Sequence, residues 1–598
     1  MEGNLMAGYD YIELKVNNGE LNLDNLNNDQ LKILDHRYVI YIYRSITNKK
    51  FYIGQTKNFK ERNKEHHDGR EQKFNSANFN EVIILFSQYF NGSSLDDVES
   101  QLITYFIADN QRSRSYPIQY SYYEVINLTM GNSIAEYQNR EDISSKVILP
   151  FWSNVLYPKK WVKSKTIDKL RDEELVKYSP IKILTEQQQN IINDILKHPT
   201  KSYVINGDAG TGKTILLTHL VAKLIKKNEK NKNNKIRIGV VVQPNWEDIA
   251  KKIFKVYGLL NNDNLTVATS TTLIKQKDLY DIIIVDESHK LSRRHNKQMA
   301  SFNSVYNIKK FSNCKSHLEI LKKLGKQMVL MYDVLQAIRP ANITRADFRE
   351  LTADFEQRTL STQFRVQVSV SKSYTSDDYI NGIKYLLYKD TNLLQYTNYN
   401  PDFDKSLFQD NADDAYFGYF EDKPLHKLSN WIDSDRNFHP EHINRVLAGL
   451  VEPWKIADGK DINKTQWHEK GYDNEPDLNL RWNSTQKNWL QSKDTDAKDQ
   501  IGSVFAVQGI DLNKVGVLIG KDLQVNKDNQ LVGDPSHFYN VNGKFSKEDY
   551  DIPTNKTEFT IYVLNIYYVL LTRGIDGIRI GFWHNDKFKK YFKETLEC

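Results

Sequence analysis

The feature that most constrains the fold is a glycine-rich segment, Gly207-Asp-Ala-Gly-Thr-Gly-Lys-Thr214, which fits the pattern GxxxxGK[ST] in full. An apolar run at residues 202–206 precedes it, and a run with helical apolar spacing at 215–224 follows it. A glycine-rich turn between a strand and a helix lets backbone N–H groups surround phosphate oxygens, and the helix N-terminus adds partial positive charge. The segment therefore predicts a phosphate-binding loop within an α/β fold.

Further apolar runs have the length and composition of buried strands. They lie at residues 236–242, 281–285, 328–332, 515–519 and 578–582. Near-continuous apolar strands that alternate with helical stretches are typical of a parallel sheet covered by helices on both faces. We therefore expect an α/β protein in which parallel sheets support the phosphate-binding loop, whereas residues 380–500 are polar and give no clear pattern.

An acidic pair, Asp286-Glu287, ends the run at 281–285. A carboxylate at the end of a buried strand can hold Mg²⁺ through water, which suits Asp286, and Glu287 is then placed to polarise the attacking water. In the loop itself, Lys213 would neutralise β- and γ-phosphate oxygens, and the Thr214 hydroxyl would ligate Mg²⁺. We expect ATP and Mg²⁺ as cofactors, and the other expected phosphate contacts are Gly207, Gly210, Thr211 and Gly212.

The order of motifs across residues 184–575 resembles a superfamily 1 helicase core, particularly the Schlafen-like helicase/ATPase group found in bacterial proteins. The resemblance implies two RecA-like lobes with parallel sheets and an ATPase activity. Cores of this kind translocate or switch with or without strand separation, so the sequence leaves unwinding open. The matching residues outside the loop and the acidic pair are Gln188, Asp333, Gln336, Arg365, Gln508, Gly509, Asp511 (where glutamate is usual) and Arg573.

The resemblance also implies roles for these residues. Gln188, with Gln187 beside it, would recognise adenine, and Asp333 and Gln336 would sense the γ-phosphate. Arg365 and Arg573 would stabilise charge on the transferring phosphoryl group.

A second set of residues lies near the N-terminus. Two short β runs, at 38–43 and 51–54, flank a polar turn and predict a hairpin. A helix is expected over 58–67, where Arg62 and His66 lie one turn apart on one face. A third strand is expected at 82–86. After it, Asp96 is placed to cap the next helix, which carries apolar residues on one face.

The pairing of Val39-Ile-Tyr41 with Tyr52-Ile-Gly54 resembles the GIY-YIG nuclease family, with Val39 in place of the first glycine. The resemblance covers residues 37–133 and continues through Arg62, His66, Glu99 and Asn127. It implies a small α/β nuclease domain. Loss of the first glycine does not remove a catalytic group, so nuclease activity is still expected.

Phosphodiester hydrolysis needs an activated water, a divalent ion and a group that stabilises negative charge. By resemblance, Glu99 would hold Mg²⁺ or Mn²⁺ as the single carboxylate ligand, and Tyr41 would be the general base or orient the water. Tyr52 and Arg62 would bind phosphate, and His66 would position Tyr41 or carry a proton. Which tyrosine acts as the base stays open.

The sequence predicts five consecutive parts. They are an extension (1–36), a nuclease domain (37–140), a connector (141–180), a first RecA-like lobe (181–375) and a second RecA-like lobe with a polar insertion (376–598).

Composition limits the compartment and the partners. No run of about 18 apolar residues is present, so a membrane span is not expected. Two cysteines, Cys314 and Cys598, do not provide a disulfide framework, and a cytoplasmic protein is expected. Basic stretches at 44–73 and 223–237 would attract phosphate backbones, although the second has the composition of a solvated loop. We expect nucleic acid as the partner, with DNA favoured over RNA, while a homodimer and a defence-system partner protein stay open.

The combination predicts an ATP-dependent or ATP-gated, metal-dependent DNA endonuclease with a helicase-like or translocase-like ATPase. This architecture is similar to bacterial anti-phage and restriction-type proteins, so defence against mobile DNA is the expected role. Three alternatives stay open: a DNA repair or recombination nuclease-helicase, an ATP-driven nucleic-acid-binding switch with an inactive nuclease fold, and an RNA-directed nuclease.

Overall fold

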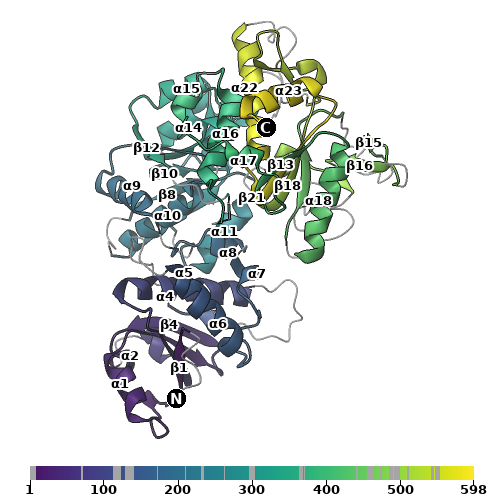
Figure 1. The fold of residues 1–598 in the computed structure, drawn as a ribbon. Helices are drawn as coiled ribbons and strands as arrows, with labels where there is room; N and C mark the ends of the chain where they lie inside the picture. Colours follow the sequence, from purple (N-terminus) through teal and green to yellow (C-terminus); the bar gives the residue numbers. More distant parts are fainter. Residues whose placement is uncertain are drawn as a thin grey trace. The chain divides into compact units, whose positions relative to one another are not determined.

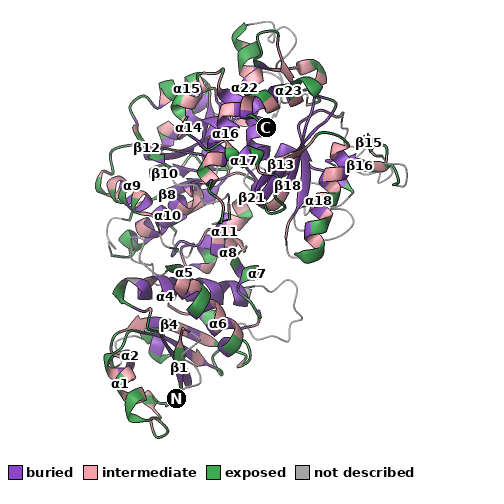
Figure 2. Cartoon of the chain, viewed as in Figure 1, coloured by how far each residue is buried: buried purple, intermediate pink, exposed green. Residues whose placement is uncertain are grey.

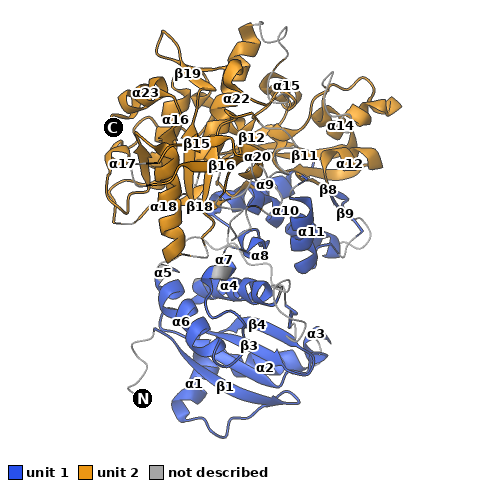
Figure 3. Ribbon diagram, turned by 90° about the vertical axis from the view of Figure 1, so that its right-hand side faces the viewer, with its two compact units in different colours: residues 1–199, 214–238, 244–267 blue, residues 200–213, 239–243, 268–598 orange. Residues whose placement is uncertain are grey.

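The computed structural model shows an α/β chain that divides into two compact units (Figure 3). Unit 1 comprises residues 1–199, 214–238 and 244–267, and unit 2 comprises residues 200–213, 239–243 and 268–598. The structure describes residues 8–68, 72–111, 123–127, 140–171, 173–182, 184–208, 210–230, 235–244, 246–260, 263–294, 303–361, 366, 368–369, 371–439, 442–453, 464–471, 475–483, 489, 499–507, 511–540, 545 and 553–598.

The N-terminal part of unit 1 is built on a six-stranded sheet with the order β2-β1-β5-β3-β4-β6 (Figure 1). The expected hairpin is present, because β3 and β4 pair antiparallel with Tyr41 opposite Gly54. The strands are β1 (Asp10–Asn17), β2 (Glu20–Leu21), β3 (Val39–Ser45), β4 (Lys50–Thr56), β5 (Glu81–Phe86) and β6 (Glu124–Val125).

Strand β1 comes from the segment that the sequence analysis places outside the nuclease domain. It pairs antiparallel with β5 along its length. Three apolar residues at alternate positions, Ile12, Leu14 and Val16, are buried while their neighbours face solvent. So short an alternation in a polar, Asn-rich segment is a weak strand signal, and pairing with β5 is what fixes it.

Helices cover both faces of this sheet. On one face Tyr41 and Tyr43 pack with Leu34 of α1 and Phe59 of α2. On the other, Phe51 meets Phe106 of α4 with ring centroids 4.9 Å apart. The helices are α1 (Asn28–His36), α2 (Phe59–His67), α3 (Gln72–Asn75) and α4 (Gly92–Gln111).

The prediction that Asp96 caps α4 is wrong, because the helix begins at Gly92. Asn91 and Ser94 form the cap: the Ser94 N–H donates to Asn91 Oδ1 at 2.9 Å, and the Asn91 N–H donates to Ser94 Oγ at 2.8 Å. This reciprocal pair satisfies two terminal N–H groups and leaves Asp96 inside the helix, one turn before Glu99.

Residues 140–182 form short helices that pack on the nuclease domain. α4 contacts both α7 and α8, and α8 also contacts α11. The elements are α5 (Arg140–Ile143), a π-helix (Ser144–Ile148), α6 (Leu149–Phe151), a second π-helix (Trp152–Leu156), α7 (Asp168–Arg171) and α8 (Glu174–Lys177), followed by α9 (Glu186–Lys197), α10 (Lys213–Lys230) and α11 (Glu247–Val256). The predicted connector is therefore packed helical structure.

The phosphate-binding loop follows β7 in a six-stranded sheet with the order β12-β7-β11-β10-β8-β9. Strands β12, β7, β11 and β10 pair parallel with their neighbours in that order. The strands are β7 (Tyr203–Gly207), β8 (Ile238–Val241), β9 (Leu265–Ala268), β10 (Tyr280–Val285), β11 (Gly325–Tyr332) and β12 (Glu356–Leu360), with helices α12 (Ser270–Gln276), α14 (His317–Leu324) and α15 (Arg345–Leu351). This is the first RecA-like lobe. Strands β7, β8, β10 and β11 coincide with the predicted apolar runs, whereas β9 and β12 were not predicted.

A second parallel sheet, with the order β13-β21-β18-β14, forms the other RecA-like lobe. Residues 380–500, which the sequence pattern leaves unassigned, contribute two of its strands. The main elements are α16 (Ser376–Tyr388), α17 (Ser406–Gln409), β13 (Phe417–Phe420), α18 (Pro424–Phe438), β14 (Arg445–Ala448), α20 (Val504–Val507), β18 (Leu512–Ile519), α22 (Pro553–Leu571), β21 (Gly574–Phe582) and α23 (Asp586–Leu596). Small additional strands are β15 (Trp467–Glu469), β16 (Leu478–Trp482), β17 (Gln500–Ile501), β19 (Leu523–Val525) and β20 (Leu531–Gly533).

The central strands of both lobes are buried, whereas the outer helix faces are exposed (Figure 2). Helix α22 is buried on all sides over most of its length, which explains its nearly continuous apolar sequence. In the part of the chain that the structure describes, no helix has both the length and the apolar character that crossing a membrane requires.

Candidate active sites

Tyr41 is the centre of the candidate nuclease site. It lies in β3, is 1% exposed, and its ring lies across Gly54 on the neighbouring strand. A Cβ atom at Gly54 would lie 2.4 Å from the Tyr41 hydroxyl oxygen. Only glycine at this position leaves room for the tyrosine, which gives the Tyr-Ile-Gly sequence a steric reason.

The Tyr41 hydroxyl contacts two residues of α2. Its oxygen lies 2.9 Å from Nε2 of His66, and it also hydrogen-bonds the Arg62 side chain. Burial, reinforced by Tyr52, raises the pKa of Tyr41 well above its usual value, so the phenol is protonated at neutral pH. Stacking on Phe74, with ring centroids 4.3 Å apart, holds the buried His66 ring in place.

Arg62 of α2 is positively charged and contacts both Tyr41 and Glu65. Burial alone would lower its pKa, but hydrogen bonds with Glu65 and Tyr41 outweigh burial and raise the pKa above the usual value. Tyr52 stacks parallel to Tyr41, with ring centroids 6.3 Å apart. The structure therefore brings together the residues that the sequence predicts on the hairpin and on the helix after it.

Glu99 lies on α4 and is 8% exposed. Its negative charge contributes to the raised pKa of Tyr41, so the two groups face the same region. Gln55 Nε2 donates to Glu99 Oε2 at 3.3 Å and also to Asp96 Oδ1. Among the described residues no group of three or more His, Cys, Asp or Glu side chains is arranged so that it could hold a metal ion. A cation held by Glu99 would thus also need oxygen ligands from water or substrate.

Sequence reasoning missed Gln55 and Asp96 as neighbours of Glu99. The available signals were the position of Gln55 directly after Gly54 and the one-turn spacing of Asp96 from Glu99. Asn127, by contrast, is placed to anchor the chain: its Oδ1 accepts the Ile53 N–H at 3.0 Å, and its Nδ2 donates to the Ile53 carbonyl.

The phosphate-binding loop has the backbone that its glycines predict. Gly210 and Gly212 have φ angles of +86° and +79°, which L-residues rarely adopt. A Cβ atom at Gly207 would lie 2.5 Å from Thr211 Oγ1, whose hydroxyl donates to the Asp208 carbonyl at 2.9 Å. The loop can therefore present its N–H groups to an anion.

Lys213 folds back over this loop. Its ammonium group donates to the carbonyls of Gly207 at 2.6 Å and Asp208 at 2.9 Å, and lies 3.7 Å from Asp333 Oδ2. Carbonyl and carboxylate oxygens are thus grouped around the ammonium group, and phosphate oxygens are chemically equivalent partners. Thr214 follows directly as the second residue of α10.

The two carboxyl groups of the acidic pair after β10 have pKa values shifted in opposite directions. Burial and then the charge of Glu287 raise the pKa of Asp286 to about 7. Burial also acts to raise the pKa of Glu287, but Lys290 and His289 outweigh it and hold that pKa well below the usual value. The His289 ring nitrogen lies 2.9 Å from Glu287 Oε2. Glu287 is therefore the ionised member of the pair.

Arg573, which follows α22, lies close to Gln336 after β11. Its Nη2 donates to Gln336 Oε1 at 3.5 Å, and Gln336 Nε2 donates to Asp333 Oδ2 at 2.6 Å. Arg573 is 1% exposed and its Nε donates to the Val569 carbonyl at 3.1 Å. A continuous set of contacts thus links Lys213, Asp333, Gln336 and Arg573.

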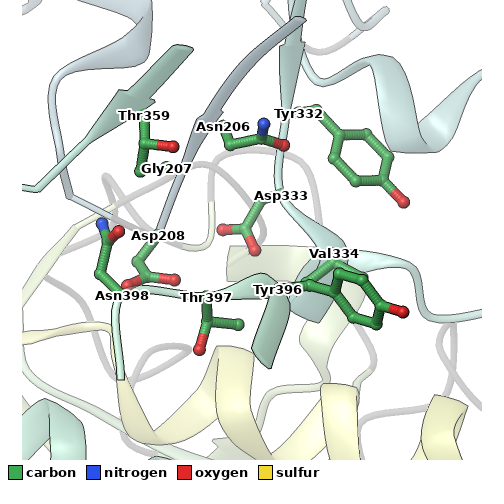
Figure 4. Close-up of a pocket in the computed structure, with 10 residues that line it drawn as sticks. All are labelled: Asn206, Gly207, Asp208, Tyr332, Asp333, Val334, Thr359, Tyr396, Thr397 and Asn398. Atoms are coloured by element: carbon green, nitrogen blue, oxygen red, sulfur yellow. The ribbon is translucent and has the colours of Figure 1, made fainter. Parts of the chain in front are cut away.

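A pocket opens at the carboxyl ends of β7, β11 and β12 (Figure 4). Figure 4 shows Asp208 and Asn398 on one side of it and the rings of Tyr332 and Tyr396 on the other. Ligands of parallel α/β sheets bind at this edge of the strands. The lining residues are Asn206, Gly207, Asp208, Tyr332, Asp333, Val334, Thr359, Tyr396, Thr397 and Asn398.

Gln188 lies in unit 1 at the start of α9 and is 3% exposed. Its Oε1 accepts the Thr185 N–H at 3.1 Å, while its Nε2 is buried without a hydrogen-bond partner. A buried amide donor in this state fits a ligand acceptor such as an adenine nitrogen. Three predicted site residues, Arg365, Gln508 and Gly509, lie outside the described residues.

Fold and sites together define a nuclease-helicase: a GIY-YIG nuclease domain followed by two RecA-like lobes. Residues 37–111 match the GIY-YIG catalytic domain. Residues 200–584, more than half of the chain, match the Schlafen group 3 DNA/RNA helicase domain. The chain belongs to the Schlafen group 3 DNA/RNA helicase family. It is a P-loop ATPase and a phosphodiester endonuclease, and nucleic acid is the class of molecule that it binds.

Similar proteins come from several sources. The uncharacterized protein YPL245W of Saccharomyces cerevisiae is 25% identical over 408 residues, which is 64% of this chain and 82% of that protein. The Arterivirus nonstructural protein 10 helicase has 11% identity, a TM-score of 0.26 and coverage of 67% of this chain and 64% of its own. The DUF1998 helicase MrfA, bound to DNA and AMPPNP, has 10% identity, a TM-score of 0.31 and coverage of 72% and 52%. This chain therefore spans less than two thirds of either helicase.

Proposed function

We propose that this protein is an ATP-gated, metal-dependent endonuclease that cuts DNA. The observation that carries this proposal is a set of buried contacts in unit 1 between the helix that bears Glu99 and the helix that follows the phosphate-binding loop. The nuclease and the ATPase are then coupled, because a displacement of the helix after the phosphate-binding loop would also displace the helix that bears Glu99.

The first half of this connection joins α4 to the segment after α8. Thr104 of α4 lies on the same helix as Glu99, and its hydroxyl is 3.3 Å from the Ser179 hydroxyl. Tyr257, at the end of α11, hydrogen-bonds both of these side chains and donates to the Leu175 carbonyl at 2.7 Å. All of these side chains are buried, so the contacts are shielded from water and sensitive to small shifts.

The second half joins α10 to the same segment. His219 of α10 is buried, and its ring lies against the backbone of Lys182 and Ser179. Burial, with the charges of Lys223 and Lys182, lowers its pKa to about 3, so the ring is neutral throughout the physiological range. Helix α10 begins at Lys213, the lysine of the phosphate-binding loop. Nucleotide binding at the start of α10 would shift this helix and so change its contact with Ser179. Because Ser179 also contacts Thr104, the shift would extend to α4.

The nuclease chemistry that we propose uses a protonated tyrosine. Tyr41 accepts a proton from the attacking water as it passes its own proton to Nε2 of His66, and the charge ends on the imidazole. Arg62 binds the scissile phosphate and stabilises the negative charge that develops on it. Glu99 would hold Mg²⁺ or Mn²⁺, and the bound ion would stabilise a non-bridging phosphate oxygen as a Lewis acid.

The ATPase chemistry that we propose uses the ionised Glu287, which orients and polarises the attacking water. Lys213 moves from the loop carbonyls to the β- and γ-phosphates. Arg573, already next to Gln336, stabilises the phosphoryl group in transfer. Arg365 is proposed for the same role on the family resemblance alone.

For the biological role we propose defence against mobile DNA in the cytoplasm. An endonuclease that cut without control would also damage the DNA of its own cell, so a gate that responds to nucleotide state suits a protein of this kind. Phage challenge of cells that carry the wild type or Glu99→Ala checks this role, and equal plating on both would contradict it.

The biochemical test is cleavage of linear DNA, supercoiled DNA and RNA with Mg²⁺, with and without ATP. Glu99→Ala should reduce cutting by at least about 100-fold and leave ATP hydrolysis intact. Lys213→Ala should abolish ATP hydrolysis and remove the ATP effect on cutting. Glu20→Ala and Lys226→Ala are matched controls at exposed positions in the same regions.

Each outcome decides between functions. Cutting of DNA that needs Glu99 and changes with ATP through Lys213 supports the proposal. DNA cleavage at the same rate with and without ATP would contradict gating. Cleavage of RNA but not of DNA would identify an RNA-directed nuclease. ATP hydrolysis without cutting of any substrate, with identical behaviour of Glu99→Ala, points to a nucleic-acid-binding switch.

A further inference from the structure

Asp208, the second residue of the phosphate-binding loop, is in an unusual position for a carboxylate. The loop binds a polyanion, and a negative charge on it opposes that binding. Asp208 is 7% exposed, so water does little to screen its charge. A second carboxylate, Asp333, interacts with it electrostatically. A positive charge close to Asp208 is therefore needed to balance its buried negative charge.

Lys384 of α16 provides that compensation. Its Nζ lies 2.5 Å from Asp208 Oδ2 and also donates to the Asn398 carbonyl at 3.1 Å. Its side chain is 1% exposed. A lysine is almost never buried to this extent unless it is paired, and here the partner is the carboxylate of the loop.

The electrostatic balance at Asp208 agrees with this geometry. Burial raises the pKa of Asp208, and Asp333 adds to the rise. Lys384 is the largest charge that acts in the opposite direction, and Lys213 is smaller. Without Lys384, the negative charge of Asp208 would be buried in the loop without its main positive partner.

Helix α16 is fixed in place from the other RecA-like lobe. The Tyr379 hydroxyl donates to the Leu571 carbonyl at 2.8 Å, and the Tyr388 hydroxyl donates to Asn565 Oδ1 at 2.7 Å. Both partners are on α22, and Asn565 Nδ2 donates in turn to the Ala337 carbonyl at 2.7 Å. Lys384 is therefore brought to the loop by a helix held outside the strand–loop–helix unit.

We propose that Lys384 is a positioning residue of the ATPase: it neutralises Asp208 and so allows the phosphate-binding loop to accept the triphosphate of ATP. Lys384 acts through Asp208 and does not bind phosphate itself. The proposal concerns ATP hydrolysis alone and does not depend on whether ATP gates the nuclease.

The test is a double-mutant cycle on MgATP hydrolysis by the full chain at about pH 8, where a carboxylate without its cation is most fully ionised. Lys384→Met should raise KM for ATP by about tenfold or more, while kcat changes by less than about threefold. Asp208→Asn/Lys384→Met should return KM to within about twofold of the value for Asp208→Asn. Lys389→Met, at the end of the same helix, is the matched control.

Three results would overturn the proposal. An unchanged KM in Lys384→Met means that the pair has no role in nucleotide binding. A loss of kcat at constant KM means that Lys384 acts on the transition state. A KM that stays raised in the double variant means that Lys384 contacts phosphate directly. If Lys384→Met does not fold, comparison of the double variant with Asp208→Asn still decides, because neither carries the carboxylate.

Discussion

Single residues decide whether the two sites can form. In the nuclease domain the decisive contact is between Tyr41 and Gly54, because the phenol occupies the space where a side chain at position 54 would begin. The hydroxyl then reaches His66 and Arg62, so one glycine sets the position of three groups. Catalytic effects of this kind depend on placement to within about 1 Å.

The first prediction follows from that contact. Gly54→Ala should displace the Tyr41 ring and reduce DNA cleavage by about 100-fold, because the Tyr41–His66 hydrogen bond is lost. ATP hydrolysis should stay within about twofold of wild type. Gly92→Ala is the matched control, because a Cβ there would meet nothing closer than 3.9 Å. Retained cleavage in Gly54→Ala would exclude a role for the Tyr41 position.

A second residue-scale prediction concerns Asp522, which is fully buried and accepts a hydrogen bond from the Tyr567 hydroxyl. Burial raises its pKa from 3.8 to about 7. The folded protein thus binds a proton that the unfolded chain has released, so stability is highest below about pH 4 for this group and falls as pH rises to about 7. The loss is roughly 4 kcal/mol at most.

Asp522→Asn removes this ionisation, so the fall in unfolding midpoint between about pH 5 and pH 7 should be smaller in the variant than in wild type. Thermal unfolding across that range measures the difference. Asp528→Asn, at an exposed position, should follow the wild-type curve. Parallel curves for Asp522→Asn and wild type would show that Asp522 does not titrate in this window.

At the scale of elements, buried side chains join the helix of the nuclease site to the helix that follows the phosphate-binding loop. Helix α4 carries Glu99 and Thr104, and α10 carries Lys213 and His219. The segment after α8 contacts both helices through Ser179. The start of α4 also determines which side chains lie near Glu99. Because the helix is capped at Asn91, Asp96 lies inside it and accepts a hydrogen bond from Gln55.

The third prediction tests this connection. Thr104→Val removes one hydroxyl from the contacts with Ser179 and Tyr257 at a stability cost of about 1 kcal/mol. ATP hydrolysis and ATP-free cleavage should each stay within about twofold of wild type, while the effect of ATP on cleavage becomes smaller. Ser100→Ala is the control, because its hydroxyl donates to the Asp97 carbonyl one turn earlier in the same helix. An ATP effect of wild-type size in Thr104→Val would place the coupling elsewhere.

At the scale of the whole molecule, residues of the second RecA-like lobe contact the phosphate-binding loop and Gln336 of the first. Arg573 and Lys384 both come from elements that belong with the second parallel sheet, and they reach Gln336 and Asp208. Superfamily resemblance predicts the arginine, whereas nothing in the local sequence marks the lysine. On the roles proposed for these two residues, ATP hydrolysis needs both lobes.

The fourth prediction belongs to this scale. Arg573→Ala should lower kcat for ATP hydrolysis by about 1,000-fold, while ATP affinity changes by only a few-fold, because the arginine stabilises charge that develops in the transition state. Arg573→Lys keeps the charge and should recover part of the rate. Turnover and nucleotide binding are measured on the same preparations. A defect in binding alone would contradict the assignment.

The sequence by itself determined the features that depend on short spacing. The phosphate-binding loop, the acidic pair after β10 and the Tyr41–Gly54 hairpin are fixed by local geometry: glycines at positive φ, a carboxylate at a strand end, and strand register. The predicted strands of both parallel sheets coincide with β7, β8, β10, β11, β18 and β21 for the same reason, since buried parallel strands are apolar at every position.

Only the tertiary structure decided the contacts between distant segments. Strand β1 lacks a strong pattern and is fixed by pairing with β5, and Asp96 is placed by a cap at Asn91 that the composition of the helix does not reveal. The ion pair of Asp208 with Lys384 joins residues that are 176 positions apart. A lysine within a helix has the same local sequence whether it is solvated or buried against a carboxylate, and burial against a partner is a property of the folded chain.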